Sequence, residues 1–136
     1  MQNAIRIERS CLDAITIHAR ENAAVECCGL LAGSGGIIQR AIPARNAAEN
    51  PATGYEIAPE EIFRMLRQIR DEQQELLGIY HSHPRSENIP SPRDIELACY
   101  PDAAYFIFSP LPAAAKQVRA FSICDGRVAE LAIEIV

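Results

Sequence analysis

Two of the three histidines in the chain, His81 and His83, stand one residue apart at the end of an apolar run. Side chains of a β-strand point to opposite faces in alternation, so these two imidazoles would project together while Ser82 turns away. Zinc is commonly held by imidazole nitrogens. The spacing therefore predicts part of a metal site at a strand end. The third histidine, His18, lies far from this motif, and we expect it to be a solvated helical side chain.

A third ligand is available at Asp94, which follows shortly after the histidine pair. The segment 91–94, Ser-Pro-Arg-Asp, has the features of a helix start: serine as N-cap, proline at the first helical position and an acidic residue in the first turn. A helix beginning there would fold Asp94 back over the strand end. Two histidines and one carboxylate leave the fourth tetrahedral position open, as in catalytic zinc sites. The cap and ligand interpretations are compatible, because a cap could orient the carboxylate.

A hydrolytic zinc site also needs a general base. Bound zinc can lower the pKa of water to about 7, and a carboxylate must still take the proton and deliver it to a leaving amine. Glu26 is the candidate, because it precedes the apolar run Cys27–Ala32 and would stand at a sheet end. The sequence alone does not show that this end adjoins the histidines. Ser91 could donate its hydroxyl hydrogen to the oxyanion of a tetrahedral intermediate.

Strands are predicted where apolar and polar residues alternate, or where an apolar run is closed by turn residues. These segments are Ala4–Glu8, Cys27–Ala32, Ile37–Ala41, Tyr55–Ala58, Leu76–His83, Ala104–Phe108, Val118–Cys124 and Val128–Ile135. The glycine-rich residues 33–36 predict a turn between the second and third of these segments, and Asp125–Gly126 predicts a hairpin between the last two. The run before the histidines is apolar on both faces, which favours an interior strand.

Helices are predicted from Ser10 acting as a cap, from Pro59 in a first turn, and from Ser91 to about Cys99. The first is ambiguous, since its residues AITIHA also alternate like a strand. In the second, an apolar stripe recurs at helical spacing through Ile62, Met65, Leu66, Ile69 and Leu76. This irregular alternation of strands and helices predicts a mixed α/β or α+β sheet with helices on its faces.

Length and composition narrow the function classes. The chain has 136 residues with a net charge of −5, which favours one domain over residues 1–136. No apolar run approaches the ~20 residues of a membrane span, and the first residues lack a signal-peptide core, so we expect a cytoplasmic protein. A single lysine argues against nucleic acid as a partner. The five cysteines lack metal or disulfide spacing, and we expect four or five of them to be buried.

The residues together resemble the JAMM signature of the MPN+ metalloproteases. That pattern is an upstream glutamate, then H-[ST]-H-P, then S-x-x-D, and the chain supplies Glu26, the segment 81–84 and the segment 91–94. The resemblance implies a JAMM/MPN-like, cytidine-deaminase-like mixed sheet. It also implies that His81, His83 and Asp94 bind Zn²⁺, that Glu26 is the general acid and base, and that Ser91 assists the oxyanion. The family commonly has a cysteine beside this glutamate, so we expect Cys27 and Cys28 to be packing residues.

The same resemblance implies a reaction, namely hydrolysis of the peptide or isopeptide bond after the C-terminal Gly-Gly of a ubiquitin-like or sulfur-carrier protein. Two alternatives stay open: a non-catalytic MPN-type scaffold, and a zinc peptidase for other small amides. Other zinc chemistries fit less well, because the metallo-β-lactamase pattern needs an aspartate at Arg85. Amidohydrolases with an H-x-H motif need a barrel of about 250 residues.

Overall fold

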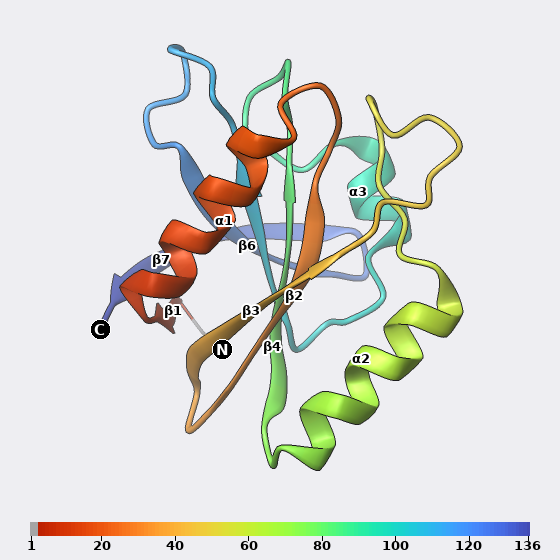
Figure 1. The fold of residues 1–136 in the computed structure, drawn as a ribbon. Coiled ribbons are helices and arrows are strands. Elements are labelled where there is room, and N and C mark those ends of the chain that lie inside the picture. The colour runs from red at the N-terminus through yellow and green to blue at the C-terminus, as the bar shows by residue number, and fades with distance from the viewer. Residues whose placement is uncertain (1–2) are drawn as a thin grey trace.

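A computed structural model describes residues 3–136 (Figure 1). Its strands are β1 (Ala4–Ile7), β2 (Cys28–Ser34), β3 (Ile37–Ala44), β4 (Glu75–Ser82), β5 (Ala104–Phe108), β6 (Val118–Cys124) and β7 (Arg127–Ile135). Its helices are α1 (Arg9–Glu21), α2 (Pro59–Asp71) and α3 (Pro92–Leu97). The mixed α and β fold class predicted from the sequence is therefore confirmed.

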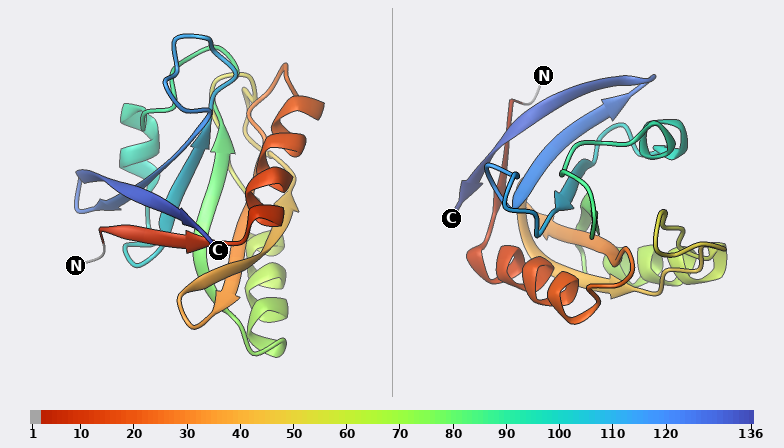
Figure 2. Two further views of the ribbon diagram at one scale, coloured as in Figure 1. Left: turned by 90° about the vertical axis from the view of Figure 1, so that its left-hand side faces the viewer. Right: turned by 90° about the horizontal axis from the view of Figure 1, so that it is seen from above.

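The strands form one closed sheet in the order β1-β3-β2-β4-β5-β6-β7. Closure depends on β1, which pairs in parallel with both β3 and β7. Strand β4 pairs antiparallel with β2 and parallel with β5, so it is the interior strand that its apolar sequence predicts. Seen from above in Figure 2, the sheet is strongly curved, and α1 lies against one face of it while α2 and α3 lie against the other. The strand with the histidines thus runs through the middle of the sheet.

The helices cover different parts of the sheet (Figure 1). Side chains of α1, among them Ile15 and Ala19, belong to one buried apolar cluster, whereas Met65 and Ile69 of α2 belong to a second. Burial of these stripes removes apolar area from water, and this is the main force that holds each helix on the sheet. No helix within residues 3–136 is long and apolar enough to cross a membrane.

The two predicted tight turns are present. Gly35 and Gly36 between β2 and β3 have φ of 63° and 75°, a conformation that glycine adopts without steric cost. Asp125 and Gly126 between β6 and β7 have φ of 51° and 76°. Turn chemistry is local, and the sequence therefore predicts both hairpins correctly.

The predicted start of the first helix is wrong. Helix α1 begins at Arg9, and Ser10 is inside the helix instead of capping it. The preceding residue, Glu8, makes no side-chain cap, and its backbone N–H donates to the carbonyl of Ile38 at 2.9 Å. The pairing of Glu8 with β3, the neighbour of β1, therefore sets the helix start, in place of the predicted Ser10 cap.

The predicted strand Tyr55–Ala58 is also wrong. This segment pairs with a loop: the N–H of Ala47 donates to the carbonyl of Glu56 at 2.7 Å, and the N–H of Glu56 donates to Asn46 Oδ1 at 3.2 Å. The segment is extended, but it has no ladder partner in the sheet. Leu76, predicted to continue the stripe of α2, lies in β4 instead. Helix α3 ends at Leu97, two residues before the predicted Cys99.

Cysteine burial is lower than predicted. All five thiols are free; the buried ones are Cys11, Cys27 and Cys28, and the exposed ones are Cys99 and Cys124. Cys99 follows the short helix α3, and Cys124 is the last residue of β6. At both places the chain reaches the surface. The prediction of four or five buried cysteines is therefore wrong.

The prediction of a solvated His18 is wrong as well. Its side chain is half-buried, and its Nδ1 lies 2.6 Å from the hydroxyl of Tyr80. Burial lowers the pKa of His18 from its ordinary value. The contact exists because α1 packs directly over the part of β4 that carries Tyr80.

Candidate metal centre

His81 and His83 project to the same side at the end of β4, as the strand period predicts. Their Nε2 atoms are 3.0 Å apart, and both residues are buried. The intervening Ser82 points away, where its hydroxyl accepts a hydrogen bond from the N–H of Cys27 at 2.9 Å. The pair is held in place because β4 is flanked on both sides by other strands.

Asp94 completes a triangle of donor atoms with the two histidines. Its Oδ2 lies 3.1 Å from His81 Nε2 and 3.0 Å from His83 Nε2. The capping box fixes this carboxylate: the N–H of Ser91 donates to Asp94 Oδ2 at 2.9 Å, and the N–H of Asp94 donates to Ser91 Oγ at 3.0 Å. The same two hydrogen bonds therefore cap α3 and orient the candidate ligand. Burial raises the pKa of Asp94, but the imidazoles of His81 and His83 beside its carboxylate outweigh burial and hold that pKa below its ordinary value.

The donor triangle has the size of a zinc site. Tetrahedral zinc with bonds of about 2.0–2.1 Å keeps its ligand atoms about 3.3 Å apart, close to the three separations found here. The Nδ1 of His83 lies 2.7 Å from the carbonyl oxygen of Glu87, which can only accept, so Nδ1 carries the proton. The lone pair of His83 Nε2 therefore faces the triangle. A backbone carbonyl on the outer ring nitrogen is the usual way in which a metal-binding histidine is oriented.

An aromatic ring orients the other histidine. Tyr55 stacks on His81 with ring centroids 4.4 Å apart and an interplanar angle of 24°. The Nδ1 atom of His81 is buried without a hydrogen-bond partner among the described residues. The stacked ring of Tyr55 consequently limits the rotation of an imidazole that no hydrogen bond holds on its outer side. The sequence pattern does not indicate this role, because it predicts a strand at Tyr55.

Strand register brings Glu26 to the same place. In the antiparallel pair of β2 and β4, Cys28 is opposite His81. Continued two residues further, the same register places Glu26 opposite His83. One acidic oxygen of Glu26 and the donor atoms of His81, His83 and Asp94 all lie within 4.8 Å of one another. The structure thus brings together Glu26, Ser91 and the three predicted ligands.

Glu26 is a carboxyl group in a poorly solvated position. The residue is only 6% exposed, and its Oε1 has no hydrogen-bond partner among the described residues. Burial raises the pKa of Glu26 to about 7, although the nearby His83 and Arg93 act in the opposite direction. A carboxyl group with a pKa near neutrality can both accept and release a proton at physiological pH.

Asn46, in the loop after β3, connects the backbone of Glu26 to the opposite wall of the site. Its Nδ2 donates to the carbonyls of Glu26 at 2.9 Å and Gly54 at 2.9 Å, with a longer contact to Pro51 at 3.4 Å. The N–H of Glu26 donates to the carbonyl of Pro51 at 2.8 Å. Both peptide groups of Glu26 are therefore tied to this loop. Sequence reasoning missed Asn46, for which the only signal was its place in an Asn-, Pro- and Gly-rich loop.

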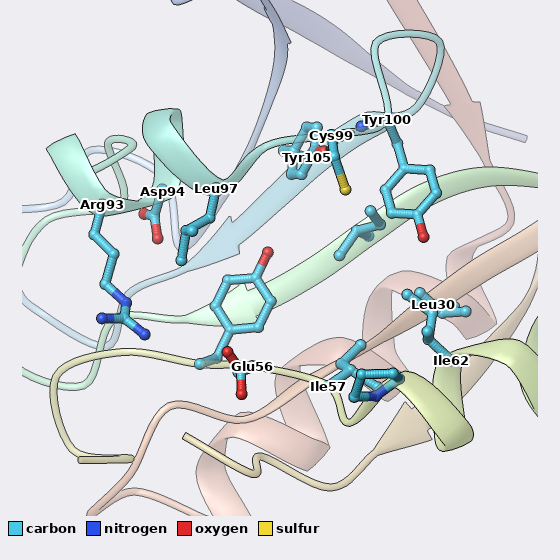
Figure 3. Close-up of a pocket in the computed structure, with 13 residues that line it drawn as sticks. Leu30, Glu56, Ile57, Ile62, Arg93, Asp94, Leu97, Cys99, Tyr100 and Tyr105 are labelled. Atoms are coloured by element: carbon cyan, nitrogen blue, oxygen red, sulfur yellow. Dashed lines mark hydrogen bonds between the residues drawn. The ribbon is translucent and has the colours of Figure 1, made fainter. Parts of the chain in front are cut away.

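A largely apolar cavity of about 310 Å³ adjoins the metal centre between α2 and α3 (Figure 3). Asp94 and Arg93 stand at one end of it, and the extended segment with Glu56 and Ile57 forms one wall. The remaining side chains of the lining are mostly aromatic or aliphatic. Such a concave apolar site with a few polar groups at one end is suited to holding an extended peptide beside the donor triangle.

Comparison with known families and proteins gives a consistent picture. Residues 8–124 match the family described as prokaryotic homologs of the JAB domain. A desampylase from Haloferax volcanii is 41% identical over 104 residues, which cover 72% of this chain and 75% of that protein. A CysO-cysteine peptidase from Mycobacterium tuberculosis is 35% identical over 132 residues, which cover 96% of this chain and 90% of that protein.

Solved structures extend the similarity to the whole fold. A Desulfitobacterium hafniense protein is 28% identical with a TM-score of 0.83, over 97% of this chain and 92% of that chain. A JAB1/MPN domain protein from Archaeoglobus fulgidus is 19% identical with a TM-score of 0.64, over 96% of this chain and 99% of that chain. The JAMM/MPN-like fold that the sequence resemblance implies is therefore confirmed.

Proposed function

This chain belongs to the prokaryotic JAB-domain family and is a JAMM-type peptidase, and from this premise we propose that it hydrolyses, with zinc, the bond after the C-terminal Gly-Gly of a ubiquitin-like or sulfur-carrier protein. The relatives named desampylase and CysO-cysteine peptidase support this substrate class. The single observation that carries the proposal is the convergence of Glu26, His81, His83 and Asp94 within 4.8 Å. We propose the cytoplasm as its location, as expected from the sequence.

In this proposal His81, His83 and Asp94 hold the zinc ion. The fit rests on their nearly tetrahedral spacing and on the outer hydrogen bond of His83 to Glu87. Zinc supplies Lewis acidity, which polarises a carbonyl and makes water more acidic. The buried, hydrogen-bonded carboxylate of Asp94 adds the negative charge that a divalent cation requires.

Glu26 moves the proton. It takes one from the attacking water and gives it to the departing amine nitrogen, so the C–N bond breaks as water oxygen stays on the carbonyl carbon. Its burial next to His83 and Asp94 and its raised pKa support both roles. Without that proton an amine anion would have to leave, and such an anion is far too basic to depart from a tetrahedral intermediate near neutral pH.

Ser91 donates to the developing oxyanion. Its Oγ accepts the N–H of Asp94, and this leaves the hydroxyl hydrogen available for a second partner. The backbone N–H of Ser91 also donates to Asp94 Oδ2, so the Ser91 hydroxyl is fixed beside the candidate metal ligand. A donor preorganised in this way stabilises negative charge that develops on the carbonyl oxygen.

The substrate tail is proposed to lie in the cavity between α2 and α3. A Gly-Gly tail has no Cβ atoms, so it can pass close to backbone in an extended form. The wall at Glu56 and Ile57 is an extended segment outside the sheet ladder, to which an extended peptide could align.

Two substitutions test the mechanism. Glu26→Gln should keep one equivalent of zinc but lower the cleavage rate at least about 10³-fold, because the proton carrier is lost. His81→Ala should lose zinc as well as activity. The assay is cleavage of a recombinant ubiquitin-like carrier that ends in Gly-Gly and bears one appended residue, followed by mass spectrometry. Unchanged cleavage by Glu26→Gln would contradict the mechanism, and a wild-type protein that never binds zinc would favour the scaffold alternative.

A further inference from the structure

Arg93 is a cation at the end of the cavity that the mechanism above does not use. It lies next to Asp94 at the start of α3, and its side chain extends toward the segment that carries Glu56 (Figure 3). Its guanidinium lies against the backbone of Gly54: a Cβ at Gly54 would be 2.9 Å from Arg93 Nε. Glycine at this position therefore leaves the space that the guanidinium occupies.

A chain of contacts links this guanidinium to Glu26. One amide group, the Nδ2 of Asn46, donates to the carbonyls of both Glu26 and Gly54 at 2.9 Å. Gly54 in turn contacts Arg93. Arg93 is thus connected through Gly54 and Asn46 to the backbone of Glu26.

Arg93 is exposed and has no anionic partner among the residues that the structure describes. Arg40, Arg64, Arg70 and Arg119 each pair with a carboxylate, whereas no carboxylate oxygen among the described residues lies within 4.0 Å of the Arg93 guanidinium. Other exposed arginines such as Arg67 are unpaired within residues 3–136 too, but Arg93 lines the cavity beside Asp94. A cation placed beside the reacting groups without a partner has its hydrogen-bond donors free for a ligand. Arginine binds carboxylates through two parallel N–H donors.

The chemistry of the leaving group indicates which carboxylate. Glu26 protonates the departing amine, so that nitrogen must lie close to Glu26 and therefore on the side where Arg93 stands. In an α-amino acid the carboxylate carbon is only about 2.5 Å from the amine nitrogen. The ε-amine of a lysine in an isopeptide bond has no carboxylate at that distance.

We propose that Arg93 binds the α-carboxylate of the leaving group, so that this peptidase favours carriers extended by a single amino acid over isopeptide-linked proteins. The inference rests on the proposed function, since it describes the leaving-group side of the same reaction. Gly54 acts with Arg93 by leaving room for the guanidinium. The substrate class is a Gly-Gly carrier with one residue appended and its C-terminus free.

The test compares two substrates that differ only at this carboxylate. A recombinant Gly-Gly carrier with one appended cysteine is prepared with a free C-terminal carboxylate and as the C-terminal carboxamide. Wild-type enzyme should cleave the carboxylate form with a kcat/KM about tenfold higher, as expected for one charge-assisted hydrogen-bonded contact. Arg93→Gln should bring this ratio close to one, while Arg67→Gln, the same charge change on the exposed face of α2, should leave it unchanged.

Gly54→Ala provides a second variant that changes no charge. Its added Cβ would lie 2.9 Å from Arg93 Nε, so the guanidinium must shift, and the ratio should fall part of the way toward one with zinc content unchanged. Equal cleavage of both substrates by wild-type enzyme would overturn the inference and leave the proposed function intact. Failure to cleave either one would instead count against the proposed function. A ratio that survives in Arg93→Gln would show that another group binds the carboxylate.

Discussion

Replacing Asn46 with alanine should destabilise the protein more than any other single change in its loop. The side chain donates to the carbonyls of Glu26 and Gly54 and accepts the N–H groups of Ala48 and Glu56, at 2.9–3.2 Å. Each such bond contributes about 0.5–1.5 kcal/mol net. Because Asn46 is only half-buried, water can replace part of this, and we expect a loss of about 3 kcal/mol.

Thermal unfolding of the zinc-free protein, followed by circular dichroism, measures this loss. At about 3 °C per kcal/mol for a chain of this size, Asn46→Ala should lower Tm by about 9 °C. Asn50→Ala is the matched control, since Asn50 is exposed in the same loop and its side chain makes no hydrogen bond among the described residues. It should change Tm by less than about 2 °C.

The same variant should also be a poor catalyst. Without Asn46 the carbonyl of Glu26 loses its partner, and the carboxyl group is less well placed, so kcat should fall at least about tenfold with zinc affinity retained. Among the described residues, Asn46 makes no hydrogen bond to His81, His83 or Asp94, so the zinc ligands keep their own contacts in this variant. A Tm within 2 °C of wild type, or a loss of zinc without a loss of stability, would refute this account of the loop.

Two further substitutions probe the groups around the donor triangle. Ser91→Ala should cost about 1 kcal/mol of stability through the lost cap, measured by denaturant unfolding, and should lower kcat about 10²-fold. Ser91→Thr keeps the hydroxyl and should restore most of the stability and of kcat. A kcat that Ser91→Ala leaves unchanged would exclude the oxyanion role. Tyr55→Leu should weaken zinc binding at least about tenfold in a chelator competition assay, because His81 loses its stacked ring. Tyr55→Phe keeps the ring and should bind zinc as tightly as the wild type. Equal zinc affinities in all three proteins would show that the stack does not orient His81.

Elements with strong local signals were predicted closely. Helix α2 begins at Pro59 as expected, since the fixed φ of proline suits a first helical position and the apolar stripe continues the helical period. Strand β5 has the predicted bounds, Ala104–Phe108. The error at Tyr55–Ala58 has the opposite cause: an extended segment becomes a strand only when another strand offers it a ladder, and here the partners are loop atoms.

The sequence by itself determined the chemical groups of the candidate centre. Strand alternation aims His81 and His83 to one side, and a local cap holds Asp94, so both could be derived from residues close together in the chain. The tertiary structure decided the rest. Glu26 joins the histidines through the register of β2 against β4, which hydrogen bonds between segments distant in sequence establish. Tyr55, Asn46 and Arg93 acquire their contacts through a loop without periodicity, where only long-range packing determines which groups meet.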